Sequence, residues 1–179
     1  MDFEKGANAL RELARAIETV SSWTGLRRGL TVSVGMAGGG TARNTIPAEA
    51  WAEVNVRIAR AADGPRMARR FAGLKAVDRR CKVAVTGGIN RPPMERTPGT
   101  ARLFERAREL AAEIGLALEE ASTGGASDGN FTSAMGIPTL DGMGAVGEGA
   151  HAQHESVVVE HLAIRTALIA GMVVECRCD

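Results

Sequence analysis

The residue types that can do chemistry are concentrated in one glycine-flanked loop, residues 147–156 (GEGAHAQHES). This loop holds two of the three histidines, His151 and His154, with Glu155 next to them. A neutral imidazole is a common zinc ligand, and its second ring nitrogen is usually held by a carboxylate or a carbonyl oxygen. One of these histidines is therefore a candidate metal ligand, with a neighbouring acid to orient it.

Spacing alone favours a simpler interpretation, in which both histidines are polar loop residues. A zinc site usually takes at least three protein ligands, most often from more than one segment. The remaining histidine, His161, lies in a predicted helix, and the sequence has no HExxH motif and no CxxC pair. The sequence therefore predicts that the loop supplies only part of a metal site.

Composition narrows the class of protein and of partner. The chain has 179 residues, of which 45% are hydrophobic and 24% charged, as in a soluble globular protein of one large or two small domains. The net charge of +1 gives no electrostatic footprint for nucleic acid or an anionic membrane. Aromatic residues make up 3% and tyrosine is absent, so base-stacking platforms are not expected either. Small-molecule partners are favoured.

Three cysteines, Cys81, Cys176 and Cys178, are an odd number and form no disulfide framework. A reducing compartment fits best, so a cytoplasmic location is expected. The Cys176–Cys178 pair is a weak candidate for metal binding, and a frayed chain end is the favoured interpretation. No apolar run of membrane-spanning length and no signal peptide is present in the sequence.

The first half of the chain predicts a small antiparallel sheet covered by two helices. A helix is expected over residues 2–21, with Asp2 as its cap, and a second helix starts near Asp63. Strands are expected over 30–36, 48–60 and 81–86. Within 48–60, one face packs and the other is wet, because apolar residues (Ala52, Val54, Val56 and Ile58) alternate with polar ones (Glu53, Asn55 and Arg57). A further strand, expected in front of the first helix, is missing.

The glycines and prolines of residues 87–93 mark a domain boundary, placed after residue 90. Thr97 and Pro98 then start a helix that runs to Gly115. Short strands are expected over 116–119 and 137–140, a short helix after 123–129, and a last helix over 159–174. This alternation is typical of half of an α/β sandwich.

Two features of the chain can bind an anion. The guanidinium of Arg57 can bind a carboxylate through two parallel hydrogen bonds, and Asn44 can add an amide donor. The Gly124–Gly125 turn before a helix start offers backbone N–H groups. By pattern alone, a strand arginine is usually a solvated residue and glycine turns are common.

Five segments in fixed order carry a family resemblance. They are residues 38–47 (GGGTARNTIP), 54–57 (VNVR), 123–131 (TGGASDGNF), 136–144 (GIPTLDGMG) and 149–155 (GAHAQHE). The set resembles the dinuclear-zinc exopeptidase and deacylase family that contains glutamate carboxypeptidase, acetylornithine deacetylase and succinyl-diaminopimelate desuccinylase. The resemblance is strongest to the glutamate carboxypeptidase branch and covers nearly the whole chain.

The resemblance implies an α/β fold of two domains. Residues 1–90 are similar to most of an α+β lid with an antiparallel sheet and two helices, which also forms a homodimer. Residues 91–179 are similar to the C-terminal portion of the zinc-exopeptidase α/β sandwich, the catalytic domain.

The resemblance also implies roles for individual residues. His151 matches the family's last zinc ligand in an active site that holds two zinc ions when complete. Asn44 and Arg57 match positions that hold a substrate carboxylate, and Arg91 and Gly125 match positions that line the substrate site. His154 matches a position that is not a ligand, and Glu155 is expected to orient or support the loop.

Other parts of the family's site have no counterpart in the sequence. They are the HxD motif, the bridging aspartate, the paired glutamates that include the general base, a further carboxylate ligand and a lid histidine, all expected upstream of residue 1. The chain is therefore expected to be a fragment with no catalytic residue of its own. The first hypothesis is a parent zinc carboxypeptidase or N-acyl amino acid deacylase that cleaves an amide next to a free carboxylate. The second is a non-catalytic dimerisation or ligand-binding module.

Overall fold

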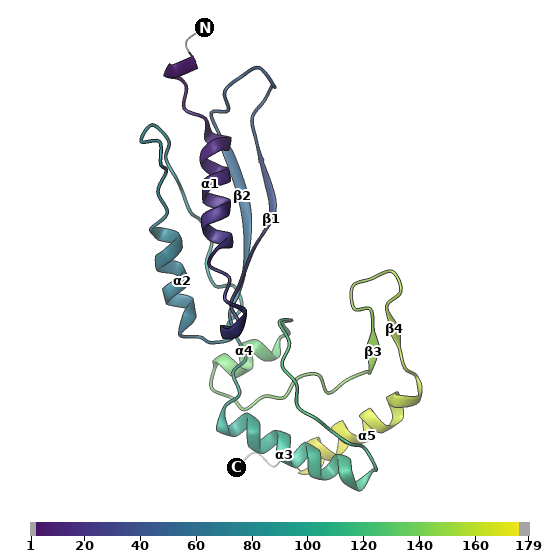
Figure 1. Cartoon of the computed structure of the whole chain (residues 1–179). Coiled ribbons are helices and arrows are strands. Elements are labelled where there is room, and N and C mark those ends of the chain that lie inside the picture. Colours follow the sequence, from purple (N-terminus) through teal and green to yellow (C-terminus); the bar gives the residue numbers. More distant parts are fainter. Residues whose placement is uncertain (1–2, 176–179) are drawn as a thin grey trace. The chain divides into compact units, whose positions relative to one another are not determined.

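The computed structural model describes residues 3–175, which form two compact units that divide between Pro93 and Met94 (Figure 1). The division falls after Pro93, three residues beyond the boundary that the glycines and prolines of the sequence predict. Within the described residues, no helix has both the length and the apolar character needed to cross a membrane. Each unit is described by itself.

The first helix begins later than the sequence predicts. Helix α1 spans Ala9–Ser21, and the Asn8 side chain caps it by accepting a hydrogen bond from the Arg11 amide at 3.0 Å. Phe3–Lys5 form a separate 3-10 turn, η1, so the prediction of one helix from residue 2 is wrong. An asparagine that satisfies a free helical N–H sets the start more strongly than the apolar spacing does. Asp2, the expected cap, lies outside the described residues.

Strands β1 (Thr31–Gly39) and β2 (Ala50–Arg57) form an antiparallel hairpin (Figure 1). The register runs from Thr31 opposite Arg57 to Gly39 opposite Ala50, with an irregularity between Val34 and Met36. Along β2, half-buried and exposed residues alternate without a break. The predicted packed and wet faces of this strand are therefore confirmed.

The core of the first unit lies where two helices meet one face of the hairpin. Its buried members are Val20 of α1, Leu30, Val32 of β1 and Met67 of α2, which spans Asp63–Ala72. Trp23 and Phe71 pack beside them edge to face, with ring centroids 5.0 Å apart. The two helices therefore share one apolar layer with the sheet, as the sequence predicts.

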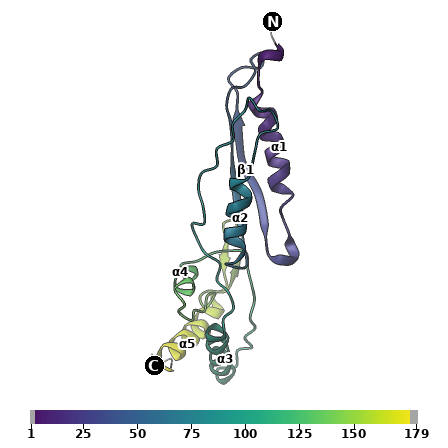
Figure 2. The same ribbon diagram turned by 90° about the vertical axis from the view of Figure 1, so that its left-hand side faces the viewer.

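The third strand expected in this unit, residues 81–86, does not form. Within the described residues the sheet has two strands, and no backbone pairing includes 81–86. The alternating sequence makes this stretch extended, but a strand also needs a neighbouring edge to pair with. The stretch runs alongside α1 and the hairpin as a separate extended segment (Figure 2).

A buried carboxylate joins α1 to the segment that follows α2. Glu12 is 8% exposed, and its carboxylate accepts hydrogen bonds from the Val77 amide at 2.6 Å and the Arg15 guanidinium at 2.5 Å. Burial alone would raise the pKa of Glu12, but the backbone N–H groups of Val77 and Asp78, together with Arg15, lower this pKa below its ordinary value of 4.5. The charged form therefore contributes stability that is present above about pH 4.5 and lost as the pH falls through the lowered pKa.

We expect Glu12→Gln to make unfolding of the first unit less sensitive to acid. Glutamine keeps an acceptor for Val77 but carries no charge, so the variant should melt several degrees below the wild type at neutral pH. The difference should shrink as the pH falls from about 5 to about 3, because the wild-type carboxylate then becomes protonated. Thermal unfolding followed by circular dichroism at each pH measures this, and two parallel curves would contradict the assignment.

The second unit is built around two long helices that lie side by side (Figure 1). Helix α3 (Pro98–Glu113) starts at Thr97, whose hydroxyl accepts a hydrogen bond from the Thr100 amide at 3.1 Å. Helix α5 spans Glu160–Glu175. Leu110 and Ala111 of α3 enclose Leu168 of α5, which is 1% exposed. Both helices are confirmed to within one or two residues of the prediction.

The strands predicted in this unit are wrong. Residues 116–119 and 137–140 pair with nothing in the described part of the chain; Leu116 and Leu118 pack instead against the α3–α5 core. Leu116 and Leu118 are half-buried without a sheet, whereas Ile137 is 51% exposed, so neither stretch has a partner edge to make it a strand. The paired strands of this unit are β3 (Gly147–Glu148) and β4 (Ser156–Val157), and α4 (Gly129–Ala134) precedes them. With helices and small antiparallel sheets, the chain belongs to the predicted α/β class.

Candidate metal and substrate site

The histidine loop closes the short hairpin of β3 and β4. Gly147 pairs with Val157 and Glu148 with Ser156, and the turn is tightened by a hydrogen bond of 2.8 Å from the Ala152 amide to the Gly149 carbonyl. The hairpin therefore fixes both ends of the loop, and the position of His151 is set by local backbone hydrogen bonds.

His151 has an unusual backbone conformation. Its φ of 67° makes it the one non-glycine residue with positive φ in the described part of the chain. The Glu155 carboxylate accepts a hydrogen bond from the His151 amide at 3.2 Å, which closes the loop across four residues. Residues held in this sparsely populated region cluster at functional sites. Glu155 therefore supports the backbone of the candidate ligand, in line with the supporting role expected for it.

The ring of His154 lies against Gly149. A Cβ atom at Gly149 would come within 2.8 Å of Cδ2 of the His154 ring, and the φ of 71° at Gly149 is itself unfavourable for other residues. The ring of His154 thus packs on the glycine backbone.

We expect Gly149→Ala to disturb the histidine loop more than Gly142→Ala disturbs its own turn. Both glycines have a φ near 70°, so both substitutions carry similar backbone strain of roughly 1 kcal/mol. A Cβ at Gly142 meets nothing within 4 Å, whereas one at Gly149 collides with His154. Amide chemical shifts of residues 147–157 measure the difference, and equal perturbation by the two variants would contradict this packing.

The described residues do not fit a complete zinc site. Across residues 3–175, no group of three or more histidine, cysteine, aspartate or glutamate side chains is placed to hold a metal ion. Cys176 and Cys178, the weak alternative ligands, lie outside the described residues. His151 can supply one ligand, and any remaining ligands must come from elsewhere.

The structure does not bring Asn44 and Arg57 together. Arg57 lies opposite Thr31 at one end of the hairpin, while Asn44 lies in the loop beyond the Gly39–Ala50 pair at the other end. Seven residue steps of about 3.3 Å along β2 separate the two ends by roughly 23 Å. One carboxylate cannot contact both side chains of one copy. Sequence separation in a hairpin does not measure distance, because it does not show where the turn lies.

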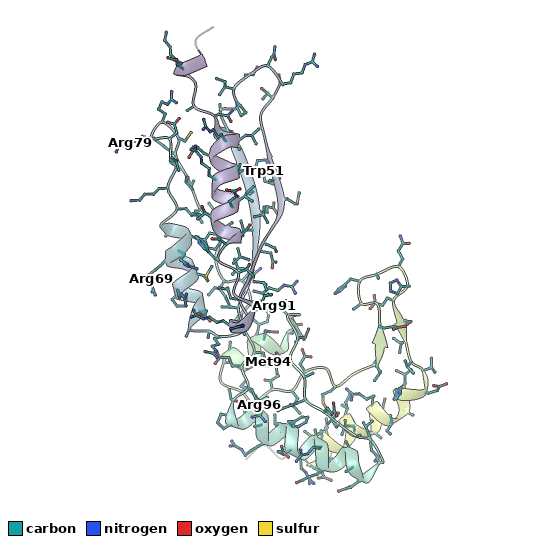
Figure 3. The ribbon with its side chains drawn as sticks, in the orientation of Figure 1. Trp51, Arg69, Arg79, Arg91, Met94 and Arg96 are labelled. Carbon is teal, nitrogen blue, oxygen red and sulfur yellow. The ribbon has the colours of Figure 1, made fainter. Side chains whose placement is uncertain are left out.

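The remaining predicted substrate residues fall in different units. Arg91, labelled in Figure 3, belongs to Met1–Pro93, whereas Gly125 belongs to the second unit with His151. The Gly125 amide donates to the Thr123 hydroxyl at 3.2 Å, and helix α4 begins at Gly129. The prediction that the Gly124–Gly125 turn offers the Gly125 amide to an anion is therefore corrected. This amide is already hydrogen-bonded, and it lies ahead of the start of α4.

Arg165 is a structural residue that sequence reasoning missed. From α5 it donates hydrogen bonds to the carbonyl oxygens of Gly144, at 2.9 Å, and Gly142. It thereby holds the GMG segment that leads into the histidine hairpin. The available signal was its place as the one arginine in an otherwise mostly apolar helix.

Comparison with known proteins places the chain in a class. The profile of peptidase family M20/M25/M40 matches residues 4–175, nearly the whole sequence. The chain belongs to this peptidase family, as the five ordered segments predict.

Two relatives show how much of such a protein the chain spans. It is 29% identical over 161 residues to carboxypeptidase G2 of Pseudomonas sp. (strain RS-16), covering 87% of this chain and 38% of that protein. The structure of aminopeptidase PepT from Bacillus cereus ATCC 10987 is similar with a TM-score of 0.75 at 23% identity, covering 95% of this chain and 46% of that one. The chain therefore spans less than half the length of each relative, and the PepT likeness shows the fold.

Proposed function

We propose that this sequence contributes part of the active site of a zinc-dependent hydrolase that cleaves an amide bond next to a free carboxylate, a carboxypeptidase or N-acyl amino acid deacylase. The observation that carries the proposal is the family match over residues 4–175. The strained, hairpin-held backbone of His151 supports it, because a ligand whose position is already fixed loses less conformational entropy when it binds a metal.

In this proposal His151 holds a zinc ion and Arg57 binds the substrate carboxylate. A zinc ion held there would supply Lewis acidity to polarise a carbonyl oxygen and to activate a water molecule. Arg57 lies at an exposed position on β2, where a planar guanidinium suits bidentate contact with a carboxylate. Since Asn44 lies at the far end of the hairpin, the carboxylate is assigned to Arg57 alone. Arg91 and Gly125 remain proposed lining residues.

A chimaera tests these roles directly. Residues 4–175 would replace the matching segment of carboxypeptidase G2, and hydrolysis of N-acyl amino acids would be measured. In an active chimaera, Arg57→Ala is expected to raise KM at least tenfold with a smaller effect on kcat, because carboxylate binding is lost in ground and transition states alike. His151→Ala is expected to lower kcat at least a hundredfold and to reduce the zinc content.

Matched variants separate these effects from general damage. Arg57→Lys keeps the charge but not the bidentate geometry, so its KM should lie between those of the wild type and Arg57→Ala. Arg60, an exposed arginine just beyond the same strand, serves as the control position for Arg60→Ala. An unchanged KM in Arg57→Ala would remove Arg57 from the substrate site.

The alternative function is a non-catalytic module that dimerises through its first unit or binds a ligand weakly. The observation that favours it is the incomplete ligand set among residues 3–175. We propose the same homodimer for the parent enzyme. Sedimentation velocity that shows a strict monomer at high protein concentration would count against both.

A further inference from the structure

The tripeptide that leads into the histidine hairpin, residues 142–144, is held to helix α5 in two ways. The half-buried Arg165 of α5 donates hydrogen bonds to the carbonyl oxygens of Gly142 and Gly144, the second at 2.9 Å. Between these two glycines, the Met143 side chain packs against the core that α3 and α5 share. The tripeptide is therefore fixed to α5 through its backbone and to the core through its side chain.

A run of backbone hydrogen bonds connects this tripeptide to His151. Two residues after Gly144, the Val146 carbonyl accepts a hydrogen bond from the Val158 amide at 2.8 Å. Strands β3 and β4 then pair, and His151 lies in the loop between them. Because a single residue separates the tripeptide from the first of these bonds, a shift of the tripeptide moves the start of the hairpin with it.

Both strands of the hairpin are thereby tied to the same helix. Strand β4 ends at Val157 and the chain enters α5 at Glu160 (Figure 1). Strand β3 is tied to α5 through Arg165, so residues 142–165 form a closed loop with His151 in its outer part. Each strand has only two paired residues, and a two-stranded hairpin is marginally stable by itself. The guanidinium therefore adds a constraint that the hairpin's own pairing does not supply.

We propose that Arg165 is a positioning residue that sets the place and orientation of His151. It acts through the carbonyl oxygens of Gly142 and Gly144 and through the hairpin, and has no contact with substrate in this proposal. The planar guanidinium suits the task, because its fixed fork can donate to two carbonyl oxygens at once, whereas an ammonium is a compact point charge. The inference rests on the proposed function for the role of His151, while the anchoring of the hairpin by Arg165 can be measured without any activity.

The first test follows backbone amide exchange by nuclear magnetic resonance in the full 179-residue chain. In Arg165→Met, which removes both hydrogen bonds, the Val158 amide and the paired amides of β3 and β4 should exchange at least about fivefold faster, since local opening becomes easier. Arg165→Lys can still donate to one carbonyl oxygen, so its exchange rates should lie between those of Arg165→Met and the wild type. Unchanged exchange in Arg165→Met would overturn the proposal.

Arg106 supplies the matched control in the same unit. From α3 it pairs with Glu109 at 2.8 Å and with Glu175 of α5, away from the tripeptide in its contacts. Arg106→Met should therefore leave exchange at residues 147–158 unchanged, even if it lowers the midpoint of urea unfolding. Equal acceleration in the two variants would mean that the hairpin only reports general loss of stability, and would also overturn the proposal.

The second test places Arg165→Met in the active chimaera with carboxypeptidase G2. A misplaced His151 should lower kcat at least about tenfold with KM within about twofold, because positioning affects the transition state while the substrate carboxylate is still bound. Faster exchange in the hairpin with an unchanged kcat would overturn the positioning role. An unchanged kcat in His151→Ala would instead contradict the proposed function, so the failures of the two proposals can be told apart.

Discussion

Replacing Leu168 by alanine is expected to lower the free energy of unfolding of the second unit by about 3 kcal/mol. Leu168 is 1% exposed and lies in the centre of the contact between α3 and α5, against Leu110 and Ala111. Truncation there removes apolar contacts and leaves a cavity between the two helices, which they can fill only in part by shifting toward each other. Few other side chains in this unit are buried, so the loss is a large share of its stability.

The same helix offers a matched control. Leu162 is 42% exposed, so Leu162→Ala should change the free energy of unfolding by well under half as much. Urea unfolding followed by far-ultraviolet circular dichroism compares the two variants, with the midpoint as the readout. If Leu162→Ala were as damaging as Leu168→Ala, the α3–α5 contact would not be the core of this unit.

The second large effect is expected in metal content and turnover. After dialysis against buffer, the 179-residue chain should retain no stoichiometric zinc and should not hydrolyse an N-acyl glutamate. The physical reason is ligand number: one histidine cannot hold zinc against water, and residues 3–175 bring no third ligand-type side chain near any other two. Elemental analysis and a hydrolysis assay on the same sample measure both quantities.

Each result has a distinct meaning for the proposed function. Absence of bound zinc and of turnover agrees with a chain that supplies His151 and Arg57 to a site completed by other residues. Two tightly bound zinc ions with turnover would mean that ligands are assembled in a way the described residues do not show, and the incomplete-site interpretation would be wrong. Zinc binding that survives His151→Ala would remove this histidine from the metal site.

Much of the fold is predictable because it depends on local chemistry. Thr97 and Pro98 start α3 through a cap and a preset φ, and the alternation along β2 fixes which residues face the helices. The start of α1 was missed because a cap at Asn8 outweighs the apolar spacing around it. The failed strand at 81–86 shows the limit of such reasoning, since strand formation depends on a partner edge that is distant in sequence.

In the candidate site, too, some features follow from the sequence and others depend on the tertiary structure. The sequence alone identified the peptidase family and singled out His151, since the order of residue types along a chain can be recognised without knowing any distance between them. Tertiary structure decided that Asn44 and Arg57 lie at opposite ends of a hairpin, that Glu155 supports the His151 backbone, and that His154 packs on Gly149. These outcomes depend on where turns fall and on which backbone groups find partners, and neither follows from spacing along the chain.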